Sequence, residues 1–409
     1  MHLKKSLLLF LISFSTLLSA QEISKLKFYG TVSNEFFYNS RKNVECTDGI
    51  VNLFPTPTEI DKVSNIDKNE VPQAEMLSIQ SRCGVDINGD SIFGAKSTGK
   101  IEADFAGAST TFYVLRIRHA YVKLNWKKTE LLIGQTWHPL FGSVMPTTPS
   151  SNSGAPFQPF NRSPQVRLKY NLNPSLSVIA AALYQMQYTS QGPLTPSASN
   201  SYLKNAILPD FFLGTECRTT HWTSGFGADI KTLKPATKSI TSASAVAYTQ
   251  YVKSAFQIKA KAIYGQNLSD HLMLGGYGVI YDTDSSTVKG YTNINTASSW
   301  LNVIYGKKIQ VGILIGLSQN LGTDIELTPT KAVNGKKFTT YGYGVYDQVL
   351  LNRLYRFAPH VSYNLSNIKV GVEYELTSAE YGNLQSNGRV INPYTVRNNR
   401  AVVSMSYLF

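Results

Sequence analysis

The residues with the clearest potential for chemistry are arginines and lysines at alternate positions of strand-like segments. Arginine presents a planar fork of N–H donors that binds a carboxylate or a phosphate through two parallel hydrogen bonds. Glu102 and Asp104 lie among these cations and could hold them extended across an interior. The set predicts binding of small anions. For any individual member, the first interpretation is a place in a salt-bridge network along a wall, and a role in selectivity is the alternative. The candidate cations are Arg82, Lys100, Arg116, Arg118, Arg167, Lys169, Arg356 and Arg400.

Two of these candidates, Arg116 and Arg118, raise a question of phase. They occupy the same alternate positions as Ala120 and Val122, whose apolar side chains are expected to face outward. Two explanations are open. Either a β-bulge shifts the phase of this strand, or the two arginines do not line the interior.

The proline-rich segment 139–162 is the candidate for a loop that folds into an enclosed space. It contains five prolines together with glycines and aromatic residues. Prolines restrict the unfolded segment and so reduce the entropy lost when a loop is fixed against a wall. The alternative is an ordinary loop that caps one end of the fold. The residues expected to form a constriction are Pro139, Phe141, Pro156, Phe157, Phe160 and Arg162.

Signatures of catalysis are missing from the sequence. It contains no Gly-x-Ser-x-Gly elbow, no His-Glu-x-x-His helix and no phosphate-binding glycine loop. The histidines are dispersed, and Cys46, Cys83 and Cys217 are odd in number without the spacing of metal ligands. We therefore expect unpaired cysteines, no enzymatic activity, no metal site and no cofactor.

The first twenty residues have the features of an export signal. Two lysines precede an apolar run at Leu7–Leu18, and Ala20 is a small residue suited to cleavage. A helix needs about 20 residues to span a bilayer, so this run is too short for a membrane anchor. We expect a signal peptide at 1–20, removed on export, and a single domain at 21–409.

Composition and periodicity favour β-strands. The chain has 24 Tyr and 29 Gly against three Cys, and no later apolar stretch has the length of a membrane helix. Apolar and polar residues alternate instead, as in 26–32 and 368–377. Alternation alone cannot say whether the apolar face meets a protein core or lipid. A last strand ending in Phe409, after an export signal, is typical of bacterial outer-membrane barrels.

Short turns alternate with long connections along the chain, as in outer-membrane barrels. Their number predicts about sixteen strands. Segment 272–282 also has the pattern of a strand, but an odd number would leave the termini on opposite sides, so we assign it to the loop 266–295. The expected fold is all-β, a transmembrane antiparallel up-and-down barrel with short periplasmic turns, long extracellular loops and room for an aqueous channel.

Three consecutive pieces of the chain resemble the trimeric outer-membrane porins of the DcaP-like family, which is related to phosphate-selective porins. They are Gly99–Phe105, Leu115–Leu124 and Leu132–Phe141. Their order and spacing carry the resemblance, which covers roughly 97–170 and the C-terminal strand. It implies a sixteen-stranded homotrimer in which each protomer has its own pore, selective for small anions.

The net charge fits that expectation. It is +13 for the whole chain and +11 once the two signal lysines are lost. An exported protein meets no nucleic acid, so anionic lipid head groups and anionic solutes are the expected partners. We expect a porin of the Gram-negative outer membrane that passes carboxylates or phosphate. The alternatives are a non-conducting barrel acting as adhesin or structural protein, an outer-membrane hydrolase, or a gated receptor, which needs about 22 strands.

Overall fold

The computed structural model describes residues 25–107, 114–282, 287–332 and 335–409, so the expected signal peptide at 1–20 lies outside the described residues. Almost every element is a β-strand; the helical pieces are α3 (Ser201–Ala206) and the 3-10 turns η1 (Pro139–Phe141) and η2 (Ser269–His271). Among the described residues, no helix combines the length and the apolar character needed to cross a membrane.

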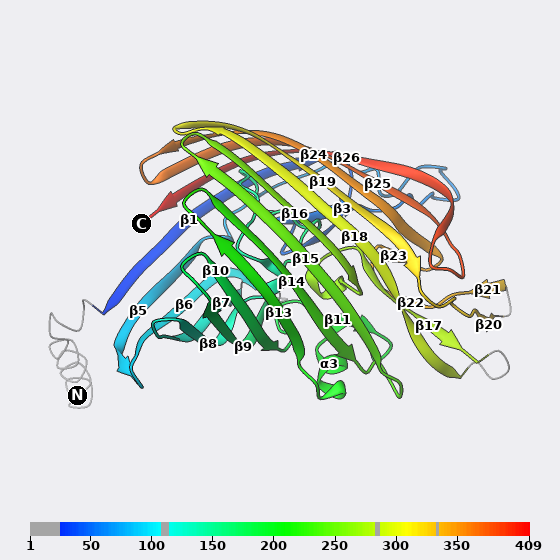
Figure 1. Cartoon of the computed structure of the whole chain (residues 1–409). Helices are drawn as coiled ribbons and strands as arrows, with labels where there is room; N and C mark the ends of the chain where they lie inside the picture. The colour runs from blue at the N-terminus through cyan, green and yellow to red at the C-terminus, as the bar shows by residue number, and fades with distance from the viewer. Residues whose placement is uncertain (1–24, 108–113, 283–286, 333–334) are drawn as a thin grey trace, which may run out of the picture.

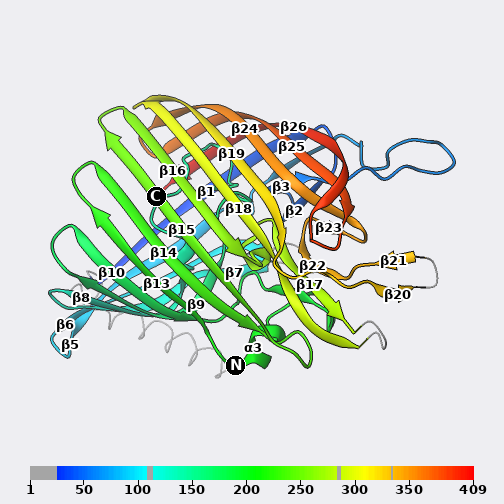
Figure 2. The same cartoon turned by 45° about the vertical axis from the view of Figure 1, so that its right-hand side comes forward.

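The strands close into one antiparallel barrel (Figures 1 and 2). β1 (Leu26–Asn39) closes the ring because it pairs with β26 (Val390–Leu408) on one side and β5 (Arg82–Ile92) on the other. In the described part of the chain, sixteen strands form the wall, which confirms the expected fold class and strand number. The others, in wall order, are β6 (Ala95–Gly107), β7 (Val114–Asn125), β8 (Thr129–Trp137), β9 (Arg162–Asn171), β10 (Leu176–Leu183), β13 (Asp210–Arg218), β14 (Trp222–Leu233), β15 (Ile240–Lys253), β16 (Phe256–Gln266), β18 (Val288–Gly306), β19 (Ile309–Thr323), β24 (Val349–Leu365) and β25 (Ile368–Leu384).

The two ends of the barrel differ. One end carries turns of two to four residues, such as Phe93-Gly94 between β5 and β6, and the other carries the long loops. The segment 272–282 contains β17 (Gly275–Tyr281), which pairs with β18 beyond the point where β16 ends, so it belongs to a loop as predicted. β4 (Gln73–Leu77) continues the wall from β5, because it pairs with the remaining part of β1. The loops hold β2 (Asn43–Cys46), β3 (Val51–Pro55), β11 (Ser190–Gly192), β12 (Thr195–Ser199), β20 (Thr330–Ala332), β21 (Gly335–Lys337), β22 (Thr340–Tyr343) and β23 (Val345–Tyr346).

The wall is apolar outside and polar inside. Phe28 and Tyr407 lie on the outer face, with 74% and 44% of their surface exposed, whereas Lys259 (9%) and Glu375 (1%) face inward. Every second residue of a strand points to the same face, so one alternation produces both surfaces. This is the reverse of a soluble β-sandwich and suits a barrel whose outside meets lipid.

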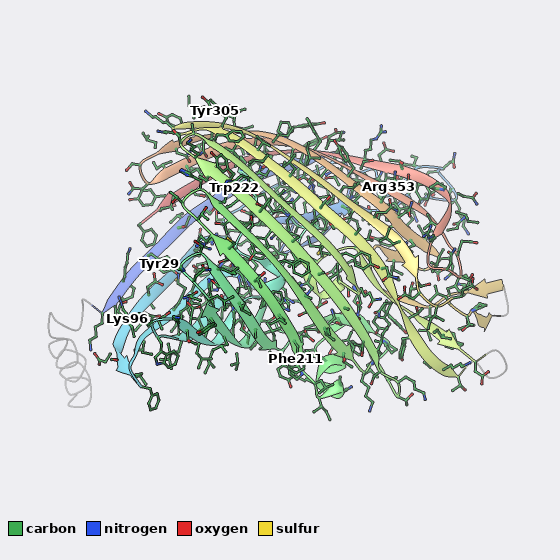
Figure 3. All side chains as sticks on the ribbon, in the orientation of Figure 1. Tyr29, Lys96, Phe211, Trp222, Tyr305 and Arg353 are labelled. Carbon is green, nitrogen blue, oxygen red and sulfur yellow. The ribbon has the colours of Figure 1, made fainter. Side chains whose placement is uncertain are left out.

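Aromatic residues mark the two ends of the outer surface. Trp222 and Tyr305 lie near the turn end, and Phe211 lies near the loop end (Figure 3). All three are at least half exposed on the outer face. Such girdles border the apolar band of outer-membrane barrels.

The interior is partly filled by three segments from the loop end. The hairpin β2–β3 buries Leu53 and Phe54 completely. Loop 138–161, which contains η1, and loop 267–274, which contains η2, pack with it in one apolar cluster inside the barrel. The sequence predicted only the second of these segments.

Candidate functional site

The loop 139–162 crosses the interior and is fixed to the acidic part of the wall. The Ser150 hydroxyl donates to Glu373 over 2.8 Å, and the backbone N–H of Ser151 donates to Glu35 over 3.0 Å. These two carboxylates come from β25 and β1. The loop therefore covers acidic side chains that would otherwise face the interior.

Lysines of β16 hold the same loop from another side. Lys261 donates to the side chain of Gln158 over 2.7 Å and to the carbonyl of Phe141, and it is buried. Lys259 donates to the hydroxyl of Thr147 over 2.6 Å. Because both cations bind loop acceptors, the loop has a defined path across the barrel.

Two of the expected pore-lining cations are covered by loops. Arg356 and Arg400 point inward, as their parity predicts, but only 1% and 0% of their surface is exposed. Arg356 donates to the carbonyls of Ala155 and Leu53, each over 2.8 Å, and Arg400 donates to the carbonyl of Gly49 over 3.1 Å. The structure thus places them as anchors of the hairpin β2–β3 and of loop 139–162, away from open space.

The other expected cations lie on the wall formed by β5 to β9. In β7, a β-bulge determines which way Arg116 and Arg118 point. Glu102 is opposite His119 while Ala103 is opposite Ile117, so Arg118 is an additional residue in β7. A bulge of this kind re-aims the side chains on one side of it. Both arginines of β7 consequently point inward, which confirms the first of the two explanations.

The acidic residues of β6 hold these arginines in place. Arg116 binds Asp104 through two hydrogen bonds of 2.9 Å, and Arg118 binds Asp104 over 2.7 Å and Glu102 over 2.6 Å. Tyr29 donates to Glu102 over 2.9 Å. Two carboxylates thus fix two guanidinium groups at the inner surface.

Three arginines of this inner wall have no acidic partner. Among the described residues, no carboxylate oxygen lies within 4.0 Å of Arg82, Arg162 or Arg167, and the Nε of each is buried without a hydrogen-bond acceptor. A buried, unsatisfied donor on a charged group is costly. An anion that reaches these groups would supply the missing acceptors.

Two cavities lie along this basic wall. The first has a volume of about 200 Å³ and the second about 260 Å³, and Trp137 lines both. Each cavity brings four cations together with two carboxylates, so each has a formal excess of two positive charges. The count for the first cavity includes Asp104, which binds Arg116 and Arg118. The first is lined by Arg82, Arg116, Arg118, Arg162 and Glu102, and the second by Lys123, Arg167, Lys169, Arg218, Glu130 and Glu216.

The remaining expected residues are distributed as follows. Lys100 pairs with Asp86 over 3.1 Å, and Lys169 pairs with Glu216 over 3.3 Å. All six residues expected to form a constriction are buried. Among them, Arg162 and Phe160 line the first cavity, Pro139 lines the second, Phe141 stacks on Trp137, Phe157 lies beneath Arg356, and Pro156 follows Ala155.

Sequence reasoning missed several residues of the interior. Lys123 has the opposite parity to the outward-facing Ala120 and Val122, so alternation after the bulge in β7 would have found it. Lys259 and Lys261 alternate with apolar residues in the segment 256–262, but this alternation does not show that a loop would bind them. In the part of the chain that the structure describes, no cluster of three or more His, Cys, Asp or Glu side chains could hold a metal ion, and the three cysteines are free, the latter as expected.

No family model matches the sequence, and a search of curated proteins finds no significant match. Among solved structures, the chain is similar to the outer-membrane channel DcaP of Acinetobacter baumannii, with 18% identity, a TM-score of 0.66, and coverage of 94% of this chain and 97% of that one. It is also similar to an anion-selective porin of Comamonas acidovorans, with 11% identity, a TM-score of 0.53, and coverage of 94% and 99%. The outer-membrane protein OmpT of Vibrio cholerae, in trimer form, gives 12% identity, a TM-score of 0.52, and coverage of 94% and 99%.

These likenesses establish the fold. The chain has the sixteen-stranded porin fold, with loops folded into the interior. Structural similarity to DcaP over nearly the whole chain agrees with the DcaP-like resemblance of three sequence segments.

Proposed function

We propose that the chain is a DcaP-like porin of the Gram-negative outer membrane that lets small hydrophilic anions, such as carboxylates or phosphate, diffuse passively through a constricted aqueous channel. The observation that carries the proposal is the set of three inward arginines, Arg82, Arg162 and Arg167, whose buried Nε donors have no acceptor. A diffusion channel needs no catalytic group, only charges that lower the energy of a partly dehydrated solute.

The arrangement of charge supports an anion preference. Loop 139–162 binds carboxylates of β1 and β25, so these acids contribute less to the field in the open part of the interior. The cations of β5 to β9 remain along the two cavities, each with an excess of positive charge. A cleft lined by one sign of charge raises the local concentration of the opposite ion.

Location and partners belong to the same proposal. The apolar outer surface suits outer-membrane lipid, and we propose that the signal peptide at 1–20 is cleaved on export. We also propose a homotrimer that meets at the low part of the wall, where β7 to β10 have 8 to 12 residues against 15 to 19 in the wall strands β18, β19, β24, β25 and β26. Leu115 and Ile117, exposed on this side, would then be covered by a second copy.

A planar bilayer with a gradient of potassium chloride tests the central claim. We expect chloride to be more permeant than potassium, which the sign of the reversal potential reports. Cation preference would remove the anion claim while leaving the pore in place. Cross-linking of the purified protein in detergent tests the trimer, and a monomer would remove that part of the proposal.

One observation favours a second function, a non-conducting barrel that acts as an adhesin or structural protein. Three loop segments fill part of the interior and share one apolar cluster. Swelling of liposomes in sugars of graded size separates the two. A porin admits the smaller sugars and excludes the larger ones, whereas a filled barrel admits none.

A further inference from the structure

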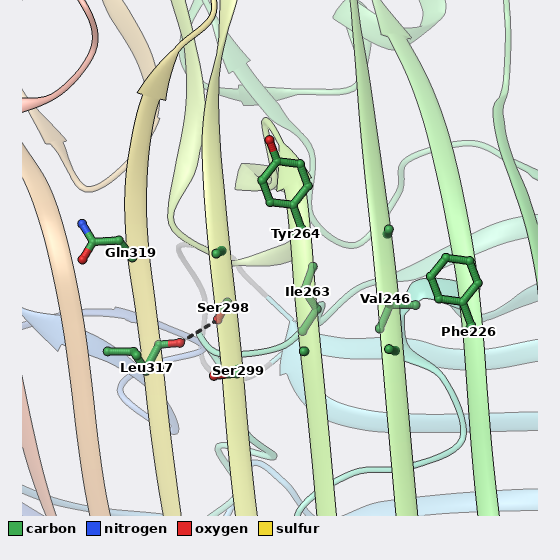
Figure 4. A pocket seen from close by; sticks show the side chains of 12 residues that line it. Phe226, Val246, Ile263, Tyr264, Ser298, Ser299, Leu317 and Gln319 are labelled. Atoms are coloured by element: carbon green, nitrogen blue, oxygen red, sulfur yellow. Dashed lines mark hydrogen bonds between the residues drawn. The ribbon is translucent and has the colours of Figure 1, made fainter.

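The outer wall contains a hollow of about 440 Å³ across strands β14 to β19 (Figure 4). Its floor is made by small outward side chains, among them Ala262 and Ala297, so the surface is depressed there. Bulky residues border it, and the apolar ones among them are at least 44% exposed. The outward-facing lining consists of Ala245, Ala247, Ala262, Ala297 and Ser299 in the floor and Phe226, Tyr264, Leu317 and Gln319 at the border.

The hollow lies in the half of the apolar band nearer the loop end. Tyr305 marks the turn end of the outer surface, and Ala297 is eight residues along the same strand. With a rise of about 3.3 Å per residue and a tilt of roughly 35–45°, eight residues correspond to about 20 Å of height in a band about 25 Å tall. In an outer-membrane barrel this is the depth of acyl chains of the outer leaflet.

A cation stands at the head-group level beside the hollow. Arg353 lies on the outer face near the loop end (Figure 3), ten residues along β24 from Tyr363, which corresponds to about 25 Å of height. Its Nε donates over 2.7 Å to the side chain of Gln319, which lines the hollow. Glu380, its register partner on β25, accepts instead from Asn352, and no carboxylate among the described residues lies within 4.0 Å of Arg353.

We propose that the hollow and Arg353 together form a binding site for one phosphorylated glycolipid of the lipid A class. An acyl chain would occupy the hollow, and a phosphate would accept from the terminal nitrogens of Arg353, which the bond from Nε to Gln319 orients. The guanidinium fork matches a phosphate through paired hydrogen bonds. The site is separate from the low wall of β7 to β10, so trimer formation there would leave it facing lipid. This inference rests on the outer-membrane location proposed above.

Binding of purified lipid A to the full chain, refolded in detergent and followed by native mass spectrometry, tests the proposal. We expect one saturable lipid per chain. Arg353→Gln should weaken binding about tenfold and bring it to the level of lipid A from which the phosphates have been removed. The double variant Ala262→Leu/Ala297→Leu fills the hollow and should abolish binding of both lipids. Matched controls on β26 are Arg397→Gln and Ala401→Leu, which are also outward-facing and should bind as the wild type does.

Two results would overturn the site: no saturable binding to the wild type, or equal loss of binding in the β26 controls. Folding is checked by heat-modifiable migration in gels, so an unfolded variant is not mistaken for a loss of the site. The readout does not depend on ion flow. A barrel that binds lipid A but conducts no ions contradicts the proposed channel, whereas a conducting barrel without saturable binding contradicts the lipid site alone.

Discussion

The guanidinium group of Arg162 lies over the indole ring of Trp137, with 3.7 Å between the guanidinium carbon and the ring centroid. A cation over an aromatic face is attracted by the negative charge of the ring, more strongly where water is excluded. Trp137 lines both cavities of the basic wall. The stack thus holds the positive charge of Arg162 next to Trp137, the residue that the two cavities share. Among the described residues, this charge has no acidic partner.

Replacing Arg162 by glutamine should lower the preference for anions. At a separation of about 15 Å and an effective dielectric constant of about 20, one unit positive charge stabilises chloride and destabilises potassium by roughly 1 kcal/mol each, so its removal should change the ratio of chloride to potassium permeability by about 30-fold. Reversal potentials in a salt gradient measure this ratio. The control is Arg397→Gln on the outer wall, which should leave it unchanged. A ratio in Arg162→Gln equal to that of the wild type would remove this arginine from the selectivity site.

Replacing Asp104 by asparagine should have the opposite effect. Asp104 accepts hydrogen bonds from Arg116 and Arg118, and its loss raises the formal excess of the first cavity from two positive charges to three. We expect a stronger anion preference together with a lower melting temperature, because two guanidinium groups lose a charged acceptor. A shift in the same direction as that of Arg162→Gln would contradict the assignment of charge in this cavity.

The wall of this fold could be predicted from the sequence because lipid and water impose opposite demands on successive residues. Phe28 and Lys259 follow directly from that rule. The sequence also suggested the bulge at Arg118 as one of two explanations. On an unbroken strand, the arginines and the apolar residues at the same alternate positions could not face opposite sides of the wall. Strict alternation of apolar and polar residues thus indicates the regular strands of the wall, and a break in the alternation indicates the bulge.

The interior could not be predicted to the same degree. Alternation gives the face on which a side chain lies, but not what covers that face. Arg356 and Arg400 therefore looked equivalent to Arg167, although loops bury the first two against backbone carbonyls. The second strand of the first hairpin, Val51–Pro55, is buried along its whole length. It therefore shows no alternation, and the sequence predicted only a long loop there.

Replacing Arg356 by methionine should loosen the loops. The side chain binds the carbonyls of Ala155 and Leu53 and pairs with Glu375 over 3.2 Å. Its loss leaves Glu375 buried without its cation, which costs roughly 3–5 kcal/mol of stability. We expect earlier unfolding in urea and a larger single-channel conductance. The double variant Arg356→Met/Glu375→Leu should recover part of the stability while keeping the larger conductance; unchanged conductance in both would mean that these loops do not limit the pore.

Acid should release the outer part of the first loop, because Asp67 organises it. Burial raises the pKa of Asp67, but the backbone N–H groups of Glu59 and Asn69, each at 3.0 Å, and the guanidinium of Arg41 outweigh it, so the pKa lies below its ordinary value. A depressed carboxyl pKa stabilises the folded loop above the unfolded pKa of about 3.9, and this contribution is lost as the pH falls through the folded pKa. Hydrogen exchange, corrected for intrinsic rates, should show protection of residues 57–70 at pH 6 and its loss near pH 2. Asp67→Asn should lack the protection already at pH 6, and if it is as protected there as the wild type, the carboxylate is not what holds this loop.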